Sequence, residues 1–142
     1  MSETSFETAV SAEVAGNLQA IYERVKSAHR DNADATPTLV AVSKRQPDDR
    51  IEAALVAGHR VFGENRVQEA QERWSERRSV YPDLKLRLIG PLQSKKSEDA
   101  VALFDTIDVL DREKLCRTLA DAIQKLGKAP DILVQVNTGF TA

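Results

Sequence analysis

Apolar and polar positions change their spacing along the chain, which predicts helices and strands in alternation. Between Phe6 and Val25, apolar residues recur every three or four positions, the spacing of one face of a long helix. Residues 39–42 then form a short continuous apolar run bounded by Pro37 and Pro47, a pattern typical of a strand covered on both faces. The first part of the chain is therefore predicted to be a long helix followed by a buried strand.

The alternation continues to the end of the sequence. Further strands are predicted at 61–64, 84–90, 106–110 and 132–136, with helical patterns between them. Asn65 and Asp111 are expected to cap the helices that follow the second and fourth strands. Strands that alternate with helices predict a parallel sheet with right-handed crossovers, either an open doubly wound sheet or part of a (β/α) barrel. No glycine-rich nucleotide motif is present, which disfavours a nucleotide-binding open sheet.

Composition limits the range of partners. At 142 residues the chain can bury a real core, and residues 1–142 are expected to form one domain. Its 20 basic and 22 acidic residues form no charge block, so neither a nucleic acid nor a membrane surface is expected as a partner. The sequence shows no leader pattern and no apolar run of membrane-spanning length, so a cytoplasmic location is expected.

Cysteine and histidine give no sign of a metal site. Cys116 is the only cysteine, which excludes an internal disulfide, and its helical context predicts a small buried thiol. His29 and His59 have no partner at metal-ligand spacing, so both are expected at the surface. We therefore expect no bound metal.

Lys44 is the residue whose position most suggests chemistry. It ends the first predicted strand, and ligands gather beyond the carboxyl ends of strands in barrels and open α/β sheets alike. A partly desolvated lysine at such a place can act as an amine nucleophile. The alternative is that Lys44 is simply the first solvated residue after a strand. The local pattern leaves both interpretations open.

Three segments stand in order at the ends of the first three predicted strands. They read L-V-A-V-S-K at 39–44, F-G-E-N-R-V-Q-E at 62–69 and L-I-G-P-L-Q-S-K-K at 88–96. Together with V-Q-V-N-T-G at 134–139, they closely resemble the pyridoxal phosphate homeostasis family, also described as the YggS-like or proline synthase co-transcribed family. The resemblance runs from about Val14 to Gly139 and extends to the amino-terminal barrel of alanine racemase.

The resemblance implies a partial (β/α) barrel of the alanine racemase N-terminal type, with five parallel strands after a long helix, that binds pyridoxal 5′-phosphate. Lys44 matches the lysine that forms a Schiff base with the cofactor aldehyde, and Asn65 matches an asparagine at the cofactor pocket. The implied function is intracellular homeostasis of the cofactor, without a catalytic residue. Apo-enzymes that require the cofactor are the implied protein partners.

Two other functions stay open. A racemase-like enzyme needs a second acid/base group on the opposite face of the cofactor, and neither Tyr22 nor Tyr81 belongs to a motif at the barrel mouth. A fragment that binds no cofactor could instead associate with another polypeptide through its sheet edges.

The sequence departs from the family pattern in charge and in length. Arg87 stands where many relatives carry histidine and Lys95 where they carry asparagine, which is expected to add positive charge that favours an anionic cofactor. A closed barrel has eight strands in about 250 residues, so we expect an incomplete barrel truncated at its C-terminal end. In the family, the phosphate cup comes from strands beyond the fifth. A monomer is expected for the complete form, and open sheet edges leave self-association open for the short one.

Overall fold

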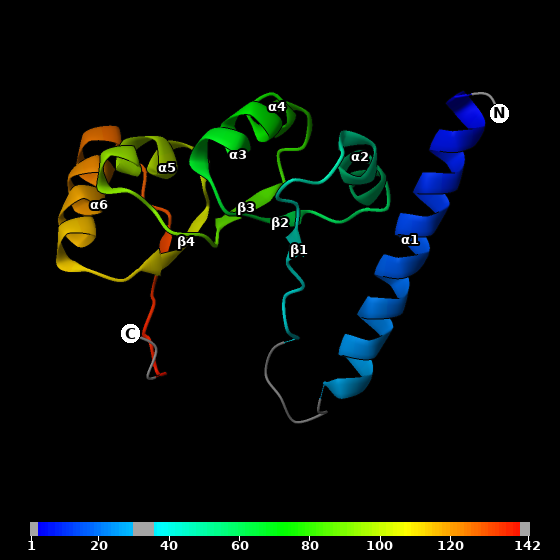
Figure 1. Ribbon diagram of the computed structural model, residues 1–142, viewed down its shortest axis with the longest axis horizontal. Coiled ribbons are helices and arrows are strands. Elements are labelled where there is room, and N and C mark those ends of the chain that lie inside the picture. Colours follow the sequence, from blue (N-terminus) through cyan, green and yellow to red (C-terminus); the bar gives the residue numbers. More distant parts are fainter. Residues whose placement is uncertain (1–2, 30–35, 140–142) are drawn as a thin grey trace. The chain divides into compact units, whose positions relative to one another are not determined.

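The computed structural model describes residues 3–29 and 36–139, and its elements follow the chain as a long helix and then strands alternating with helices (Figure 1). The helices are α1 (Glu3–Ala28), α2 (Asp48–Val56), α3 (Val67–Trp74), α4 (Arg77–Val80), α5 (Ser97–Leu103) and α6 (Glu113–Leu126), and a 3₁₀ turn, η1 (Ser94–Lys96), precedes α5. The strands are β1 (Ala41–Val42), β2 (Val61–Glu64), β3 (Lys85–Leu88), β4 (Thr106–Leu110) and β5 (Asp131–Val134).

The five strands form a sheet in the order of the chain, β1-β2-β3-β4-β5. The pairs β3 with β4 and β4 with β5 are parallel, and Ile107 lies opposite Leu88 on one side and Ile132 on the other. The predicted parallel sheet of five strands is thereby confirmed. The chain divides into two compact units, residues 1–61 and residues 62–142.

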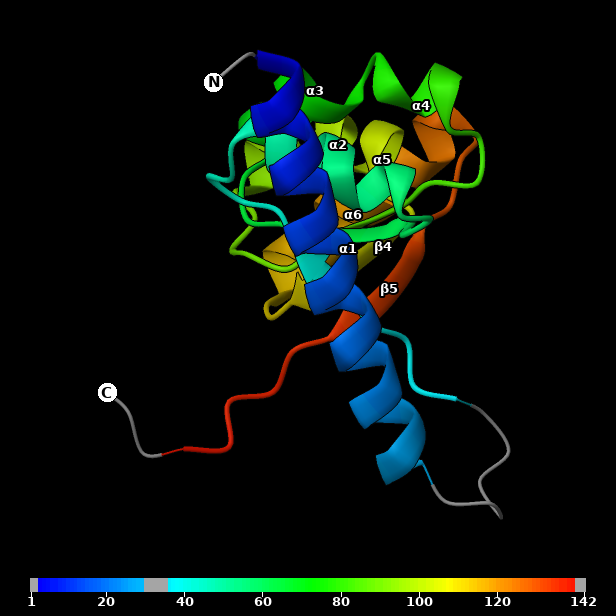
Figure 2. The same ribbon diagram turned by 90° about the vertical axis from the view of Figure 1, so that its right-hand side faces the viewer.

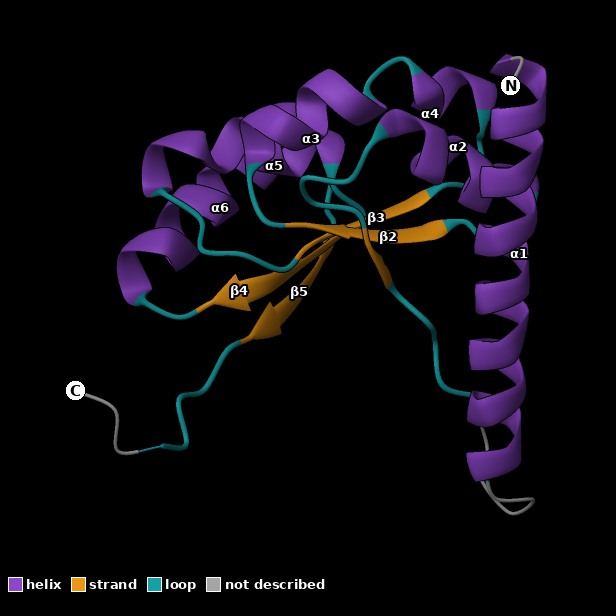
Figure 3. Ribbon diagram, turned by 45° about the vertical axis from the view of Figure 1, so that its right-hand side comes forward, coloured by secondary structure: helices purple, strands orange, loops and turns teal. Residues whose placement is uncertain are grey.

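In the second unit, α3 to α6 lie on one face of the strands (Figure 2 and Figure 3). The reason is the alternation of side chains along β3 and β4, since successive residues of a strand point to opposite faces. Arg87 and Asp108 are half-buried on the face away from the helices. The residues buried beneath the helices are Leu86, Leu88, Ile107 and Val109. A doubly wound sheet carries helices on both faces, so the one-sided cover of this unit matches part of a (β/α) barrel.

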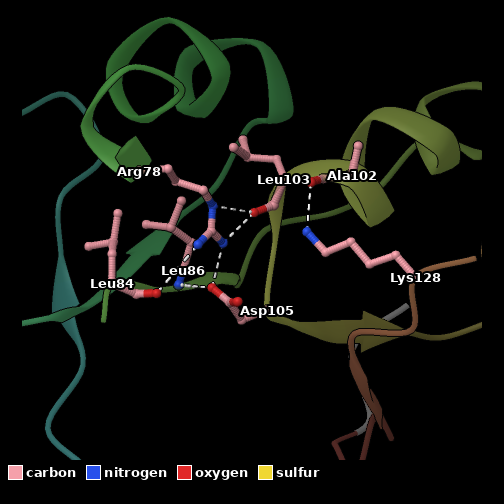
Figure 4. A network of polar contacts seen from close by, with 7 residues as sticks. All are labelled: Arg78, Leu84, Leu86, Ala102, Leu103, Asp105 and Lys128. Atoms are coloured by element: carbon pink, nitrogen blue, oxygen red, sulfur yellow. Dashed lines mark hydrogen bonds and ion pairs between the residues drawn. The ribbon is translucent and has the colours of Figure 1, made fainter. Parts of the chain in front are cut away.

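A polar network ties the amino ends of β3, β4 and β5 together (Figure 4). The Arg78 guanidinium donates to the Leu103 carbonyl and lies 2.5 Å from Asp105 Oδ2. The same carboxylate accepts the backbone N–H of Leu86 at 2.8 Å. Lys128 donates to a carbonyl of α5, and burial, followed by the nearby Arg78 charge, lowers the pKa of its amine. These contacts lie at the amino ends of the strands. Residues at that end of a barrel contribute to stability, whereas ligands bind at the carboxyl ends.

Both predicted helix caps are wrong by one residue. The N-cap of α3 is Arg66 instead of Asn65, and the N-cap of α6 is Arg112 instead of Asp111. Neither N-cap makes a side-chain cap hydrogen bond. In the second case a tertiary contact explains the change, because Arg112 donates both to the Leu92 carbonyl and to the Asp111 carboxylate, each at 2.7 Å. The Asp111 carboxylate therefore pairs with Arg112 rather than with the helix N-terminus.

Cys116 is exposed, so the prediction of a buried thiol is wrong. The residues of α6 that reach the core are Leu115, Leu119 and Ala122. Cys116 comes one position after Leu115, which turns its side chain by about 100° around the helix axis and away from the core.

In the first unit α1 packs against α2. The predicted apolar stripe of α1 is confirmed in part. Val10 is buried, and Val14, Leu18 and Val25 are half-buried, whereas Ile21, also predicted in the stripe, is 41% exposed. The first strand is shorter and less covered than predicted: β1 has 2 residues, and Val42 is 48% exposed. Since β1 stands first in the sheet order, β2 is its only neighbouring strand among the described residues.

His59 is buried at 3% exposure, so its predicted surface position is also wrong. Its Nε2–H donates to the Val61 carbonyl at 2.6 Å, because a carbonyl oxygen can only accept. The Nδ1 atom then accepts a hydrogen bond from the Tyr22 hydroxyl of α1. Burial lowers the pKa of His59, the Val61 carbonyl opposes this change, and the Arg60 charge adds to it. The neutral imidazole therefore joins α1 to the segment that leads into β2.

We expect the first unit to lose stability as the pH falls below about 6.5, the unfolded pKa of histidine. Because the pKa of His59 is lower in the folded state, the unfolded chain binds the proton more readily. The stabilisation is complete above the unfolded pKa and is lost as the pH falls towards the folded pKa, by about 1.4 kcal/mol per pKa unit. Urea unfolding followed by helical circular dichroism at several pH values measures this loss.

The matched variant is His59→Gln, whose amide keeps a donor and an acceptor but takes up no proton in this range. We expect a flatter pH dependence of its free energy of unfolding. An identical dependence in the variant and the parent would show that other groups cause the acid destabilisation.

Candidate functional site

Lys44 lies in a tight turn that follows β1. The turn spans residues 43–46 and is closed by the Gln46 N–H, which donates to the Ser43 carbonyl at 3.1 Å. Ser43 is buried at 3% exposure, and Pro47 is the N-cap of α2. The backbone of Lys44 is thus held between a buried residue and the start of a helix.

Arg45, the next residue, has a φ of 58°. This left-handed conformation suits glycine and costs other residues about 1–2 kcal/mol, because Cβ approaches the carbonyl oxygen. Backbone strain of this kind persists where the surrounding structure enforces it, and it clusters at functional sites. The strained turn therefore marks the Lys44 segment independently of the sequence motif.

The Lys44 side chain itself is exposed. It forms no hydrogen bond or ion pair with any residue in the described part of the chain. The amine is therefore open to a ligand from solution. The partial desolvation expected for this lysine is not found in the described structure.

Asn65 lies at the bend between β2 and α3 in the second unit and is half-buried. Because Arg66 is the N-cap of α3, the Asn65 carboxamide does not serve the helix. It makes no hydrogen bond with the residues that the structure describes. A side chain with two N–H donors and a carbonyl acceptor thus stands at the carboxyl end of β2.

Gly90 packs directly against the backbone of Asn65. A Cβ atom at position 90 would lie 2.5 Å from the Asn65 carbonyl oxygen and 2.7 Å from its Cα. Contacts that short require backbone movement, so the approach depends on glycine. The preceding residue, Ile89, donates its N–H to the Glu64 carbonyl at 2.9 Å. The I-G segment after β3 therefore supports Asn65 from one side.

Glu64, the last residue of β2, is fully buried. Its Oε1 accepts hydrogen bonds from the Trp74 indole N–H and from the Arg73 guanidinium, both at 3.1 Å. The sequence pattern assigned no role to this residue. The signal that could have identified it is an acidic residue inside an apolar strand, since a carboxylate is rarely buried unless it is paired.

Arg87 and Asp108 form an ion pair on the helix-free face of β3 and β4, with 3.1 Å between nitrogen and oxygen. The expectation that Arg87 adds positive charge is thereby corrected, because the Asp108 carboxylate offsets it. Lys95 is exposed in η1, where its charge remains at the surface. Within the described ranges, no cluster of three or more acidic, histidine or cysteine side chains could hold a metal ion. No described helix is both long and apolar enough to cross a membrane.

Residues 16–141 match the family described as alanine racemase, N-terminal domain. The chain therefore belongs to this family, which confirms the predicted fold class of a partial (β/α) barrel. Within the family it is similar to proteins named pyridoxal phosphate homeostasis protein, as the sequence motifs predicted.

The relative from Vibrio cholerae is 36% identical over 130 residues, which cover 89% of this chain and 55% of the relative. The relative from Homo sapiens is 36% identical over 132 residues, which cover 85% of this chain and 48% of the relative. The solved structure of PipY from Synechococcus elongatus with PLP bound is similar with a TM-score of 0.76 and 36% identity, covering 91% of this chain and 57% of PipY. The chain spans about half the length of the curated relatives it matches.

Gly90→Ala is expected to destabilise the second unit by about 1–3 kcal/mol, the usual cost of overpacking a close contact. The added Cβ forces the Asn65 backbone to move, because it meets a main-chain oxygen rather than a flexible side chain. Urea unfolding monitored by Trp74 fluorescence reports on this unit.

Gly16→Ala is the matched control, because a Cβ there meets nothing within 4 Å and Gly16 lies inside α1. Alanine in a helix interior is expected to stabilise by about 0.5–1 kcal/mol relative to glycine. Equal effects of the two substitutions would contradict the proposed close packing at Gly90.

Arg45→Gly is expected to stabilise the first unit by about 1 kcal/mol, because glycine adopts the observed φ without strain. Arg45→Ala removes the same side chain but keeps the strain, so it isolates the backbone effect. Urea unfolding followed by circular dichroism compares the two. Equal stability of the glycine and alanine variants would show that the turn is not strained in solution.

Proposed function

We propose that this chain binds pyridoxal 5′-phosphate through Lys44 and takes part in the intracellular homeostasis of that cofactor. The observation that carries the proposal is an exposed amine in a constrained turn directly after a strand, in a chain of the alanine racemase N-terminal family. The similarity to PipY, solved with PLP bound, and to homeostasis proteins supports the choice of ligand.

Lys44 would hold the cofactor through its Nζ amine, because an amine can condense with an aldehyde, and the cofactor would supply that aldehyde. The contribution of the chain is to hold the amine in place through the turn at 43–46, which buried Ser43 and the start of α2 fix at both ends.

Asn65 is proposed as a second cofactor-binding residue. Asn65 follows β2, and the family resemblance matches it to an asparagine at the cofactor pocket. Ligands of such folds bind outside the carboxyl ends of the strands. The Asn65 carboxamide suits the role because it does not cap α3 and can both donate and accept hydrogen bonds.

The remaining parts of the proposal follow the family resemblance. Residues 1–142 are proposed to form a single partial barrel domain in the cytoplasm, with apo-enzymes that require the cofactor as its recipients. We assign no described residue to the phosphate group, because the resemblance attributes that site to strands beyond the fifth. The complete form is proposed to be a monomer.

A racemase-like reaction is not part of the proposal. The Tyr22 hydroxyl already donates to His59, and burial raises the pKa of this phenol. Tyr81 follows α4 and precedes β3, so it lies towards the amino end of that strand. Neither position matches an acid/base group at the carboxyl ends of the strands.

Incubation with pyridoxal 5′-phosphate followed by borohydride reduction is expected to label Lys44 with about one cofactor per chain. Lys44→Ala should abolish the label, because it removes the amine, while helical circular dichroism stays unchanged. Mass spectrometry of the digested protein locates the modified lysine and measures its occupancy.

Lys95→Ala is the matched control, because it removes another exposed lysine near the end of a strand. Its labelling at Lys44 should equal that of the parent chain. Stoichiometric label on Lys95 or Lys96 in the Lys44→Ala variant would place the Schiff base elsewhere. An unlabelled parent chain would contradict covalent binding by this chain.

A further inference from the structure

We propose that Glu64 is a positioning residue, whose buried carboxylate sets the orientation of the Asn65 side chain by locking α3 to the end of β2. The inference rests on the proposed role of Asn65 in binding the cofactor. Glu64 itself is fully buried, and its carboxylate faces α3.

The link between β2 and α3 consists of two residues, Asn65 and Arg66. On the strand side, the Glu64 carbonyl accepts the Ile89 N–H at 2.9 Å, which fixes the end of β2 beside β3. The backbone of Gly90 then leaves no room for Asn65 to shift in that direction. The conformations that remain open to Asn65 and Arg66 depend on the position at which α3 begins and on the rotation of α3 about its own axis.

The Glu64 carboxylate controls that freedom through the last turn of α3. Trp74 is fully buried and donates its indole N–H to Oε1, and Arg73, with 12% of its side chain exposed, donates to the same atom. A hydrogen bond requires a narrow range of distance and angle, so two donors from one helix fix its rotation as well as its distance from the strand. Apolar contacts alone would permit larger displacements of α3 against the strand.

Apolar packing supports the helix independently of the carboxylate. The Phe62 and Trp74 rings lie with their centroids 4.6 Å apart, between β2 and α3. Loss of the carboxylate contacts should therefore let α3 rotate without unfolding the unit. Buried ion pairs often contribute little net stability compared with apolar residues of the same volume. A carboxylate at this position is better explained by the geometry that it imposes than by stability.

The test is a double-mutant cycle with pyridoxal 5′-phosphate as the probe, its binding followed by absorbance titration. Glu64→Gln, which removes the charge with little change of shape, is expected to raise the dissociation constant about fivefold. In an Asn65→Ala background, the same substitution should change it by less than about twofold. Trp74→Phe, which keeps a ring against Phe62 but lacks the N–H donor, should reproduce the effect of Glu64→Gln.

Glu69→Gln is the matched control. Glu69 is a second carboxylate near Arg73, at 3.6 Å, and lies one turn earlier on the partly exposed side of α3. Removing its charge leaves the Glu64 contacts in place, so the dissociation constant should stay within about twofold of the parent value.

A readout without cofactor separates this inference from the proposed function. In the free chain, Glu64→Gln should shift the NMR resonances of the Asn65 side-chain amide and accelerate hydrogen exchange of the Ile89 amide by about tenfold. The Gln135 amide, which donates to the Leu110 carbonyl at 2.8 Å, should be unaffected and serves as an internal reference.

Equal weakening of binding by Glu64→Gln with and without Asn65 would overturn the inference, because Glu64 would then act through the general structure. Unchanged Asn65 resonances in the free Glu64→Gln chain would overturn it as well. A parent chain that fails to bind the cofactor would instead contradict the proposed function, and the resonances of the free chain would still decide whether Glu64 positions Asn65.

Discussion

Parallel strands joined by helical crossovers constrain this fold more than any single contact. In the second unit every crossover lies on one face of the sheet. The residues buried beneath the helices on that face are Leu86, Leu88, Ile107 and Val109. The opposite face carries the ion pair of Arg87 and Asp108. The same connectivity brings the carboxyl ends of the strands to one edge and their amino ends to the other. The Arg78 network lies at the amino ends, whereas Asn65 follows the carboxyl end of β2.

The end of β2 shows how a small set of contacts defines one side chain. Gly90 permits a backbone approach that any larger residue would prevent, and the Glu64 carboxylate orients the helix that follows Asn65. Both features restrict conformations and add little to the apolar core. At the end of β1 the corresponding constraint is the strained turn at Arg45, which holds the exposed amine of Lys44.

The two candidate residues, Asn65 and Lys44, differ in their burial and in the contacts that surround them. Asn65 is half-buried and supported on both sides, whereas Lys44 projects an exposed side chain from a fixed backbone. The chain spans about half the length of the curated relatives it matches.

The sequence by itself determined the order of elements, the bounds of β2 and β4, the apolar stripe of α1 and the family, because these depend on spacing between neighbouring residues and on continuous motifs. Lys44 and Asn65 were predicted as cofactor-binding residues from such motifs, and this prediction stays a proposal. The tertiary structure decided which polar groups are buried and which groups they contact. His59 meets Tyr22 across 37 positions, Arg87 meets Asp108 across 21, and Glu64 meets Trp74 across 10. Local periodicity carries no information about partners at these separations, so the burial of His59, the offset charge of Arg87 and the shifted cap at Asp111 emerge only when the chain is folded.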